Sequence, residues 1–256
     1  MKQEVISGNV REAYDQFYQD HDQAWRMLGA KYKAQNIADI SKGREFAKVL
    51  EVGAGDGSIL HYLNEWNFAP ELYALEISES GVEAIRSRKL GSLKSAQVFD
   101  GYTIPFADNE FDLLILSHVL EHVEFERLLL RELKRVSKFQ IIEVPKDYRY
   151  GVDKRMKHFL GYGHINMYTP TSLRFLLRSE GFRILSDKLS MIPPEVTKFG
   201  RFVRQKQTKS FLSTLKIDLE FIIKRVAGSI LGKKKQEIFT NAYTVLTEKE
   251  TDLQIF

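Results

Sequence analysis

The sequence of 256 residues contains no cysteine. Disulfide bonds, thiolate metal sites and cysteine nucleophiles are therefore excluded. No run reaches the ~18 consecutive apolar residues that a membrane-spanning helix needs, and residues 1–9 lack the apolar stretch of a secretory signal. We therefore expect a cytoplasmic protein.

The charge of the chain is unevenly distributed. Hydrophobic residues make up 43% and charged residues 28% of the sequence, which is typical of a soluble globular protein with one large core. The net charge is +4, but residues 196–235 hold 11 Lys or Arg against Asp218 and Glu220, which gives +9 (11 − 2) and leaves −5 (4 − 9) for the remainder. A basic segment is thus attached to an acidic body, and this asymmetry bears on the partners of the protein.

A glycine-rich stretch follows the first predicted strand. Residues 49–52 are apolar except for Glu51, which is typical of a strand buried on both faces. Gly53, Gly55 and Gly57 let the backbone turn sharply and lie close to a ligand, because no Cβ intervenes. Apolar residues at helical spacing follow and predict a helix from about residue 56 or 57. A strand, a glycine turn and a helix N-terminus form a nucleotide-binding corner.

The glycine spacing is a near miss to a dinucleotide fingerprint, whose G-x-G-x-x-G/A pattern ends on a small residue. The last position falls on Ser58 when counted from Gly53 and on Leu60 when counted from Gly55. The glycines alone do not exclude a dinucleotide as the ligand, but the carboxylate of Glu51 would repel a pyrophosphate. An acidic strand end favours a cofactor that carries positive charge.

Two further carboxylates end the next two predicted strands. Glu76 closes the strand at residues 72–78, 19 residues beyond Gly57, where an acid can accept both ribose hydroxyls. Asp100 precedes Gly101 at the end of residues 96–101. Asp-Gly is also an ordinary turn pair.

These motifs resemble those of the class I S-adenosylmethionine (SAM)-dependent methyltransferases. The pattern Glu51-x-Gly53-x-Gly55-x-Gly57 is similar to the first motif of that family, and the resemblance is closest to the ubiquinone-biosynthesis-like and type 11 subgroups, which share Leu120-Glu121-His122 and Gly163-His164-Ile165-Asn166. The resemblance covers residues 48–182 and implies SAM as the cofactor. It implies that Glu51 and the glycines hold the methionine end, Glu76 the ribose and Asp100 the adenine. The cofactor-binding residues implied in the body are Glu51, Gly53, Gly55, Gly57, Glu76, Ile77, Asp100, Gly101 and Ser117.

The alternation of predicted strands and helices indicates a doubly wound α/β sheet. Residues 112–117, 139–145, 183–186 and 242–247 supply the later strands. The resemblance implies a Rossmann-like sheet of seven strands, with the last one antiparallel and beside the sixth. We expect an N-terminal helical lid at 1–46, a core at 47–192 and 240–250, and a basic amphipathic helical insertion at 193–239.

The segments outside the core motifs allow more than one interpretation. Residues 10–40 predict helices that either pack on the core or cover the cofactor, in which case Tyr14 and Tyr18 would present aromatic faces to the sulfonium. Residues 211–231 carry apolar residues at helical spacing with Lys and Arg on either side. Three interpretations of this segment are open: packing on the core, a homodimer interface, and a peripheral contact with an anionic membrane through residues 196–235.

His118, Glu121 and His122 would share one face of a helix, and His164 could join them from a later loop. Histidine and carboxylate ligands suit several divalent metals. The small-RNA 2′-O-methyltransferases and some quinone O-methyltransferases bind such an ion through Glu-x-x-Glu-His. Here His118 replaces the first acid, so we expect no metal.

His118 and His164 are the candidate catalytic residues. A neutral imidazole at the end of the fourth strand could take the proton from an attacking hydroxyl or amine, while alignment of the reacting atoms supplies much of the acceleration. We expect methyl transfer to an O or N atom of a small-molecule or glycan acceptor, anionic or lipid-linked, and no DNA partner. The alternatives are a non-catalytic SAM-binding or membrane-associated module and a metal-assisted RNA 2′-O-methyltransferase.

Overall fold

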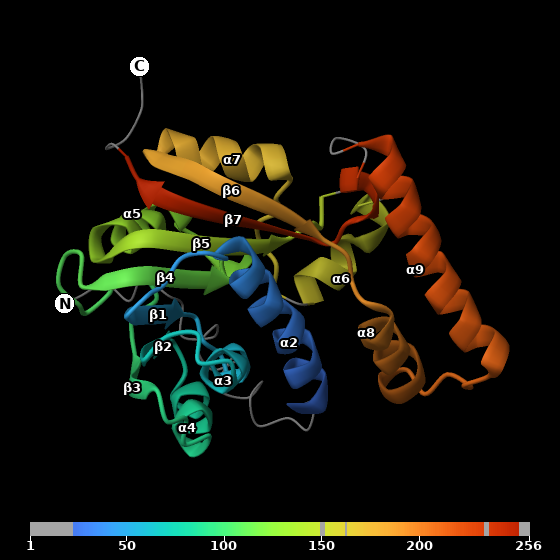
Figure 1. The fold of residues 1–256 in the computed structure, drawn as a ribbon, viewed down its shortest axis with the longest axis horizontal. Coiled ribbons are helices and arrows are strands. Elements are labelled where there is room, and N and C mark those ends of the chain that lie inside the picture. Colours follow the sequence, from blue (N-terminus) through green and yellow to red (C-terminus); the bar gives the residue numbers. More distant parts are fainter. Residues whose placement is uncertain (1–22, 149–151, 162, 233–235, 251–256) are drawn as a thin grey trace.

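A seven-stranded sheet forms the centre of the molecule in a computed structural model that describes residues 23–148, 152–161, 163–232 and 236–250 (Figure 1). The strand order is β3-β2-β1-β4-β5-β7-β6. The strands are β1 (Lys48–Val52), β2 (Glu71–Glu76), β3 (Leu93–Val98), β4 (Phe111–Ser117), β5 (Ser137–Pro145), β6 (Phe182–Ser190) and β7 (Ala242–Lys249).

The strand directions confirm the prediction of a doubly wound sheet with one reversed strand. β1 pairs in parallel with β2 and β4, β2 with β3, and β4 with β5. β7 runs antiparallel to both β5 and β6 and lies between them. The carboxyl ends of the parallel strands therefore meet at one edge of the sheet, which we call the carboxyl edge.

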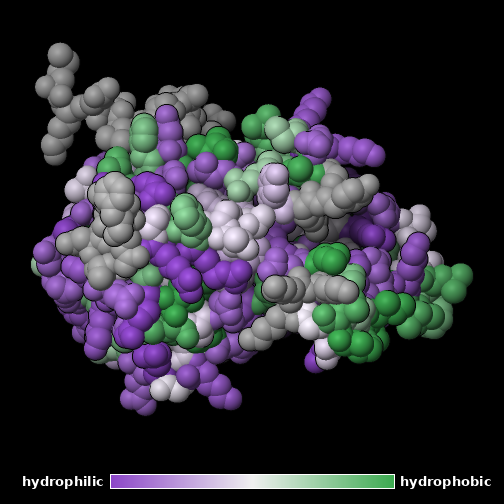
Figure 2. Space-filling view, turned by 90° about the horizontal axis from the view of Figure 1, so that it is seen from above, coloured by the Kyte–Doolittle hydropathy of each residue, from purple (hydrophilic) through white to green (hydrophobic). Residues whose placement is uncertain are grey.

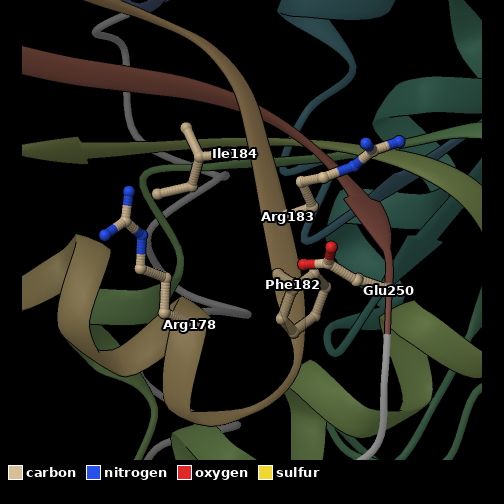
Figure 3. Close-up of a pocket in the computed structure, with 5 residues that line it drawn as sticks. All are labelled: Arg178, Phe182, Arg183, Ile184 and Glu250. Atoms are coloured by element: carbon tan, nitrogen blue, oxygen red, sulfur yellow. The ribbon is translucent and has the colours of Figure 1, made fainter.

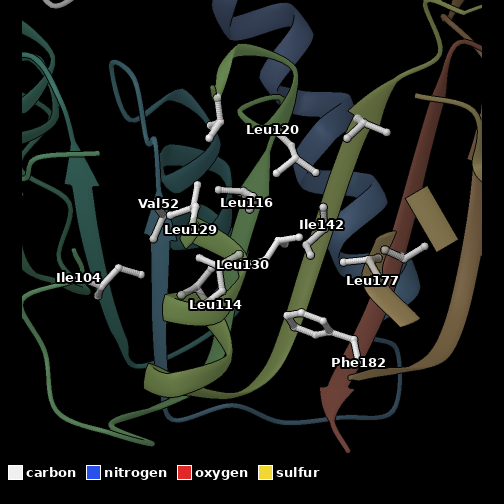
Figure 4. Packing of buried hydrophobic residues seen from close by; sticks show 14 of the residues in the cluster. Val52, Ile104, Leu114, Leu116, Leu120, Leu129, Leu130, Ile142, Leu177 and Phe182 are labelled. Atoms are coloured by element: carbon white, nitrogen blue, oxygen red, sulfur yellow. The ribbon is translucent and has the colours of Figure 1, made fainter. Parts of the chain in front are cut away.

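Helices cover both faces of the sheet, and each face has its own hydrophobic cluster. α2 (Gln23–Ile40), α3 (Ser58–Glu65) and α4 (Glu79–Ser87) pack on one face. α5 (Glu126–Val136) and α7 (Pro170–Ser179) pack on the other, where Leu129 and Leu130 meet Leu114 and Leu116 of β4 (Figure 4). The apolar run of β4 is buried on both faces, as its sequence predicts.

The N-terminal region is described from α2 onward. α2 packs against α3 and contacts β6 and β7, which agrees with a helix over this part of the predicted lid. Tyr14 and Tyr18, the two predicted aromatic contacts, lie outside the described residues.

Helical segments fill the stretch between β6 and β7. They are α8 (Pro194–Lys198), a π-helical turn (Phe199–Arg204), α9 (Phe211–Leu231) and a short 3₁₀ turn (Glu237–Phe239). α9 projects beyond the carboxyl edge, on the same side as α6 (Met156–Gly161) (Figure 1). Within the described ranges, every helix falls short of the length and apolar character that crossing a bilayer requires.

One predicted helix does not form as expected. His118 has a positive φ of 56°, and a 3₁₀ turn follows at Leu120–His122 before α5 begins. A left-handed residue cannot continue a right-handed helix. His118, Glu121 and His122 therefore do not share a helix face, and their side chains meet through this turn instead.

The start of α7 agrees with the Thr169-Pro170 signal in the sequence. Thr169 accepts a hydrogen bond from the backbone N–H of Ser172 at 3.0 Å, and Ser172 Oγ accepts one from the Thr169 N–H at 2.9 Å. This capping box satisfies two donors at the end of the helix.

We predict that Thr169→Ala lowers the free energy of unfolding by about 1 kcal/mol, because the N–H of Ser172 in the first turn of the helix loses its acceptor. Urea titration followed by circular dichroism measures it. Ser210→Ala, which removes the same cap from α9, is the control and should shift the main transition less, since α9 lies outside the core. Equal shifts for both variants would contradict this account.

Candidate functional site

The glycine corner joins the ends of β1 and β2. The N–H groups of Gly53 and Ala54 donate to the carbonyl of Leu75 at 2.8 and 3.0 Å. Gly53, Gly55 and Gly57 all have positive φ, between 57° and 73°. This left-handed backbone is the reason that the sequence has glycine here.

The side chain of Val119 packs directly against the glycine corner. A Cβ on Gly53 would lie 2.4 Å from Cγ2 of Val119, which is an impossible contact for fixed atoms. Val119 follows His118 in the turn after β4. The glycine at residue 53 therefore lets the β1 and β4 loops approach each other.

Glu51 is the least satisfied polar side chain of the corner. It is 1% exposed, and its Oε2 has no hydrogen-bond partner among the described residues. Burial raises the pKa of Glu51 well above its usual value; Lys33 opposes this shift, whereas Asp56 and Glu76 add to it. A buried acceptor without a donor costs free energy, so a ligand ammonium or sulfonium fits this position.

Glu76 braces the corner from β2. Its Oε2 accepts the N–H of Gly55 at 2.8 Å, and Oε1 lies near the N–H and hydroxyl of Ser78 at 3.4 and 3.3 Å. Burial raises the pKa of Glu76, while the N–H donors of Gly55, Ile77 and Ser78 lower it. An ionised carboxylate has about four acceptor positions, and these donors already approach them, so the ribose contact of Glu76 stays a prediction.

Asp100 and Gly101 form a turn directly after β3. Asp100 Oδ1 accepts the N–H groups of Tyr102 and Thr103 at 2.9 and 2.6 Å, and Gly101 has a φ of 89°. The N–H of Phe99 donates to the carbonyl of Glu76 at 3.0 Å, so this turn adjoins the end of β2. Asp100 and Gly101 thus form the turn that their sequence predicts, and the contact of Asp100 with adenine stays a prediction.

α2 contributes residues that the sequence motifs did not indicate. Arg26 Nε lies 3.0 Å and Arg88 Nη2 lies 3.1 Å from Oδ2 of Asp56, which follows the corner. Asn36 Nδ2 donates to Glu143 Oε2 at 2.8 Å. Burial lowers the pKa of Lys33, and the carboxylates of Glu143, Glu121, Glu51 and Asp56 oppose that shift. α2 therefore brings positive charge and a donor to an acidic site.

His118 lies between two buried carboxylates. Its Nδ1 is 3.4 Å from Glu121 Oε1, and its Nε2 is 3.3 Å from Glu143 Oε1. Ser117 Oγ also donates to Glu143 Oε1, at 3.3 Å, and Thr244 Oγ1 donates to Oε2 at 2.6 Å. The β4–β5 register places Ser117 opposite Glu143. Glu143 thus contacts His118, Ser117 and Thr244 and holds the end of β4 against β5 and β7.

These contacts decide the charge of His118. Burial and Lys33 lower the pKa of His118, but Glu121 and Glu143 outweigh them, and the net pKa is raised. Burial raises the pKa of both carboxyl groups, but His118 and their other partners bring it below its usual value. The raised pKa favours the imidazolium form of His118 between the two carboxylates, and an imidazolium is a poor proton acceptor.

His164 lies in a second group of polar side chains. Its Nδ1 is 2.5 Å from Asp147 Oδ2, and its ring packs edge-on against His122 with centroids 4.8 Å apart. The carbonyl of Glu121 accepts the N–H groups of Ile165 and Asn166, which fixes this loop against the turn after β4.

Three of these side chains could hold a metal ion. Glu121, His122 and His164 each bring one ligand atom to within 4.8 Å of the others. Both Glu121 oxygens lack a hydrogen-bond partner among the described residues. Burial lowers the pKa of His122, so the neutral imidazole that a metal requires is favoured. The donor set suits a divalent ion such as Zn²⁺, and the expected absence of metal stays a prediction.

The structure thus brings most of the predicted residues to one edge. Glu51, the three glycines and Glu76 form the corner, and Ser117, His118 and Glu121 lie beside it across β4. Ile77 packs against the core cluster below. A pocket of about 230 Å³ lined by Arg178, Phe182, Arg183, Ile184 and Glu250 is separate from this site (Figure 3). It lies at the opposite edge, since β6 begins and β7 ends there.

Comparison with known proteins identifies the class. A family described as "Methyltransferase domain" matches residues 22–187, well over half of the chain. The chain belongs to this family and is a class I SAM-dependent methyltransferase. SAM is its cofactor, and it supplies an electrophilic methyl group on a sulfonium. Glu51, whose Oε2 accepts no hydrogen bond from the described residues, fits that cationic group.

Curated relatives are distant and of differing length. The chain is 25% identical over 180 residues to the ubiquinone/menaquinone biosynthesis C-methyltransferase UbiE of Paraburkholderia phytofirmans, covering 67% of this chain and 72% of that protein. It is 29% identical over 118 residues to the chloroplastic tocopherol O-methyltransferase of Arabidopsis thaliana, covering 44% and 33%. It is 27% identical over 119 residues to YrhH of Bacillus subtilis, covering 44% and 66%. The chain therefore spans between one third and three quarters of these relatives.

Solved structures share the fold. A SAM-dependent methyltransferase from Archaeoglobus fulgidus superposes with a TM-score of 0.58 at 20% identity, covering 89% of this chain and 97% of that one. At this identity the likeness shows the fold alone.

We predict that Glu51→Gln stabilises the free protein and weakens SAM binding. The raised pKa means that ionised Glu51 disfavours the folded state at pH values above its usual pKa, so a neutral isostere should raise Tm at pH 7. Loss of the carboxylate should weaken SAM roughly ten- to hundredfold. Thermal unfolding and titration calorimetry measure the two effects.

The pH dependence gives a second readout for Glu51. SAM affinity of the wild-type protein should fall as pH decreases through the raised pKa of Glu51, because protonation removes its charge, and Glu51→Gln should lose that dependence. Glu83→Gln, at an exposed position of α4, is the matched control. Unchanged SAM affinity in Glu51→Gln would remove Glu51 from the cofactor site.

We predict that EDTA leaves SAM affinity and methyl transfer unchanged, because an imidazolium at His118 opposes a second cation beside Glu121. Calorimetry before and after dialysis, with elemental analysis, measures this. About one equivalent of a divalent ion that His122→Ala abolishes would overturn the prediction and establish a metal centre at Glu121, His122 and His164.

Proposed function

We propose that the protein transfers the methyl group of SAM to an O or N atom of a small-molecule or glycan acceptor that is anionic or lipid-linked. The observation that carries this proposal is the adjacency of two environments at the carboxyl edge. Glu51 lies in the glycine corner with an Oε2 that no described residue donates to, and two histidines with carboxylate partners, His118 and His164, lie in the turns beyond β4 and β5. One environment suits a cation and the other an acceptor that must lose a proton.

The two histidines would act differently. The pair with Asp147 orients the ring of His164. We infer that His164 takes the proton of the acceptor. The raised pKa of His118 favours its charged form beside Glu121 and Glu143, so it would donate a hydrogen bond that orients the acceptor oxygen or nitrogen.

α2 would control access to this site. Lys33 balances the carboxylates when no cation is bound, and Arg26 holds Asp56 beside the corner. A cationic cofactor competes with Lys33 for the same negative charge. We infer that Lys33 moves away from Glu51 when SAM binds.

Two supports bear on the acceptor. Two relatives are named for lipophilic compounds, one as a tocopherol O-methyltransferase and one as a ubiquinone/menaquinone biosynthesis C-methyltransferase. The basic segment would attract a negatively charged group. An RNA acceptor is less favoured, because the body around the site has a net charge near −5 (4 − 9) and would repel a phosphate backbone.

The test measures release of S-adenosylhomocysteine from SAM with pairs of acceptors, hydroxyl or amine, anionic or neutral, lipid-linked or water-soluble. We predict turnover with an anionic or lipid-linked hydroxyl or amine. His164→Gln should lower kcat by roughly 10²- to 10⁴-fold, with SAM affinity unchanged. His118→Gln should raise KM for the acceptor more than it lowers kcat.

Other outcomes would revise the proposal. SAM binding without turnover on any acceptor of the panel favours a non-catalytic SAM-binding module. A His164→Gln variant with normal kcat would show that His164 is not the base.

A further inference from the structure

α9 exposes a continuous apolar surface. Six residues separated by three or four positions make up what we call the apolar stripe: Leu212, Leu215, Leu219, Ile223, Val226 and Ile230. Their exposed fractions run from 41% for Leu215 to 78% for Ile230. Phe211 and Ile222, 79% and 52% exposed, widen the stripe on one side. Burying so much apolar surface would release a large hydrophobic free energy.

The apolar stripe is not the face by which α9 packs on the protein. Ile217 and Gly228 are the buried residues of the helix. At about 100° per residue both lie on the side opposite the apolar stripe. Lys198 of α8 pairs with Asp218 of α9 at 2.6 Å and helps hold the two helices together. The fold therefore leaves the apolar stripe without a partner in the described part of the chain.

The charges around the apolar stripe are positive. Helical geometry places Lys216 along one side of it and Arg225 along the other. The two acids of the helix are paired, Asp218 with Lys198 and Glu220 with Lys224. The loop before α9 adds Lys206 and Lys209, both exposed. An apolar surface bordered by cations complements an anionic surface.

We propose that the apolar stripe of α9 docks the protein on the surface of an anionic lipid bilayer. α9 would lie in the plane of the interface, with its apolar side chains among the acyl chains and its basic side chains at the headgroups. α9 is too polar to cross the bilayer, as an interfacial helix should be.

A second copy of the chain fits this surface less well. Including Phe211 and Ile222, the apolar surface extends over about 120° of the helix, whereas a two-helix seam is narrower. Pairing two copies would also bring the basic borders of both helices together, and the two acids of α9 are already paired with Lys198 and Lys224. Charge complementarity therefore favours the lipid surface.

Docking by α9 would orient the active site toward the bilayer. α9 lies off the end of the sheet toward which β4 and β5 point, and this is the edge that carries the glycine corner and His118 (Figure 1). Hydrophobic side chains gather at the same end of the molecule in the space-filling view (Figure 2). The docking does not depend on the proposed acceptor, because vesicle binding is measured without SAM or acceptor.

The first experiment is flotation of the full chain with two kinds of vesicle, phosphatidylcholine alone and phosphatidylcholine with about 30% phosphatidylglycerol, an anionic lipid. We expect the protein to bind the anionic vesicles. About 0.5 M NaCl should largely abolish this binding, because salt screens surface charge. A triple variant, Leu212→Gln, Ile223→Gln and Ile230→Gln, should bind at least about tenfold more weakly. Lys216→Gln with Arg225→Gln should lose roughly fivefold per residue on anionic vesicles.

The control is Phe175→Gln on α7, which changes a residue that is 71% exposed and far from α9 in sequence. It should bind vesicles as the wild type does. Calorimetry with SAM shows that each variant is folded and keeps its cofactor site. Loss of SAM binding in the triple variant would overturn the proposal, since the apolar stripe would then belong to the core.

The absence of cysteine allows a direct measurement of the contact. An environment-sensitive dye on Leu212→Cys should shift to the blue on anionic vesicles, whereas the same dye on Phe175→Cys should not. Equal response at both positions, or none at either, would overturn the proposal. So would sedimentation that shows a wild-type dimer abolished by the triple variant without any vesicle binding, which would assign the surface to a second copy.

Discussion

The structure depends on burying negative charge at one edge of a parallel sheet. Glu51, Glu121 and Glu143 are each 1% exposed, and a buried carboxylate is costly unless it is paired. Glu121 and Glu143 share one neighbour that can carry positive charge, His118, and Glu143 also accepts hydrogen bonds from Asn36 and Thr244. Lys33 acts electrostatically on Glu51, Glu121 and Glu143. A cationic ligand at Glu51 would add the positive charge that these groups do not supply.

Because these buried carboxylates need partners, α2 is part of the site and is not a separate lid over it. Arg26 neutralises Asp56, Lys33 faces the acidic groups, and Asn36 donates to Glu143. Ala34 and Ile37 of the same helix are fully buried in the hydrophobic cluster. Movement of α2 would therefore uncover apolar surface and unbalance charge together, so a shift of Lys33 alone is easier than opening of the whole helix.

Sequence patterns predicted the parts of the site that local chemistry determines. Glu51 stands out because it interrupts an apolar strand, and the glycines because the backbone needs positive φ. Glu143 carries the same signal, a charge within a buried strand, but no role was assigned to it. Its pairing with His118 depends on the β4–β5 register, and the contribution of Asn36 depends on a contact 107 positions away. The helix expected at residues 118–122 was wrong, because a left-handed conformation at His118 is not visible in composition or periodicity.

The two ends of the insertion between β6 and β7 lie side by side, at the last residue of β6 and the first residue of β7. Ser190 pairs with Ala242, and Asn241 fastens both sides through the carbonyl of Ser190 and the N–H of Ile192. The two ends of the segment are thus held together whatever lies between them. The strand register that positions Glu143 is therefore set on one side of this closure, and the length and chemistry of the segment on the other.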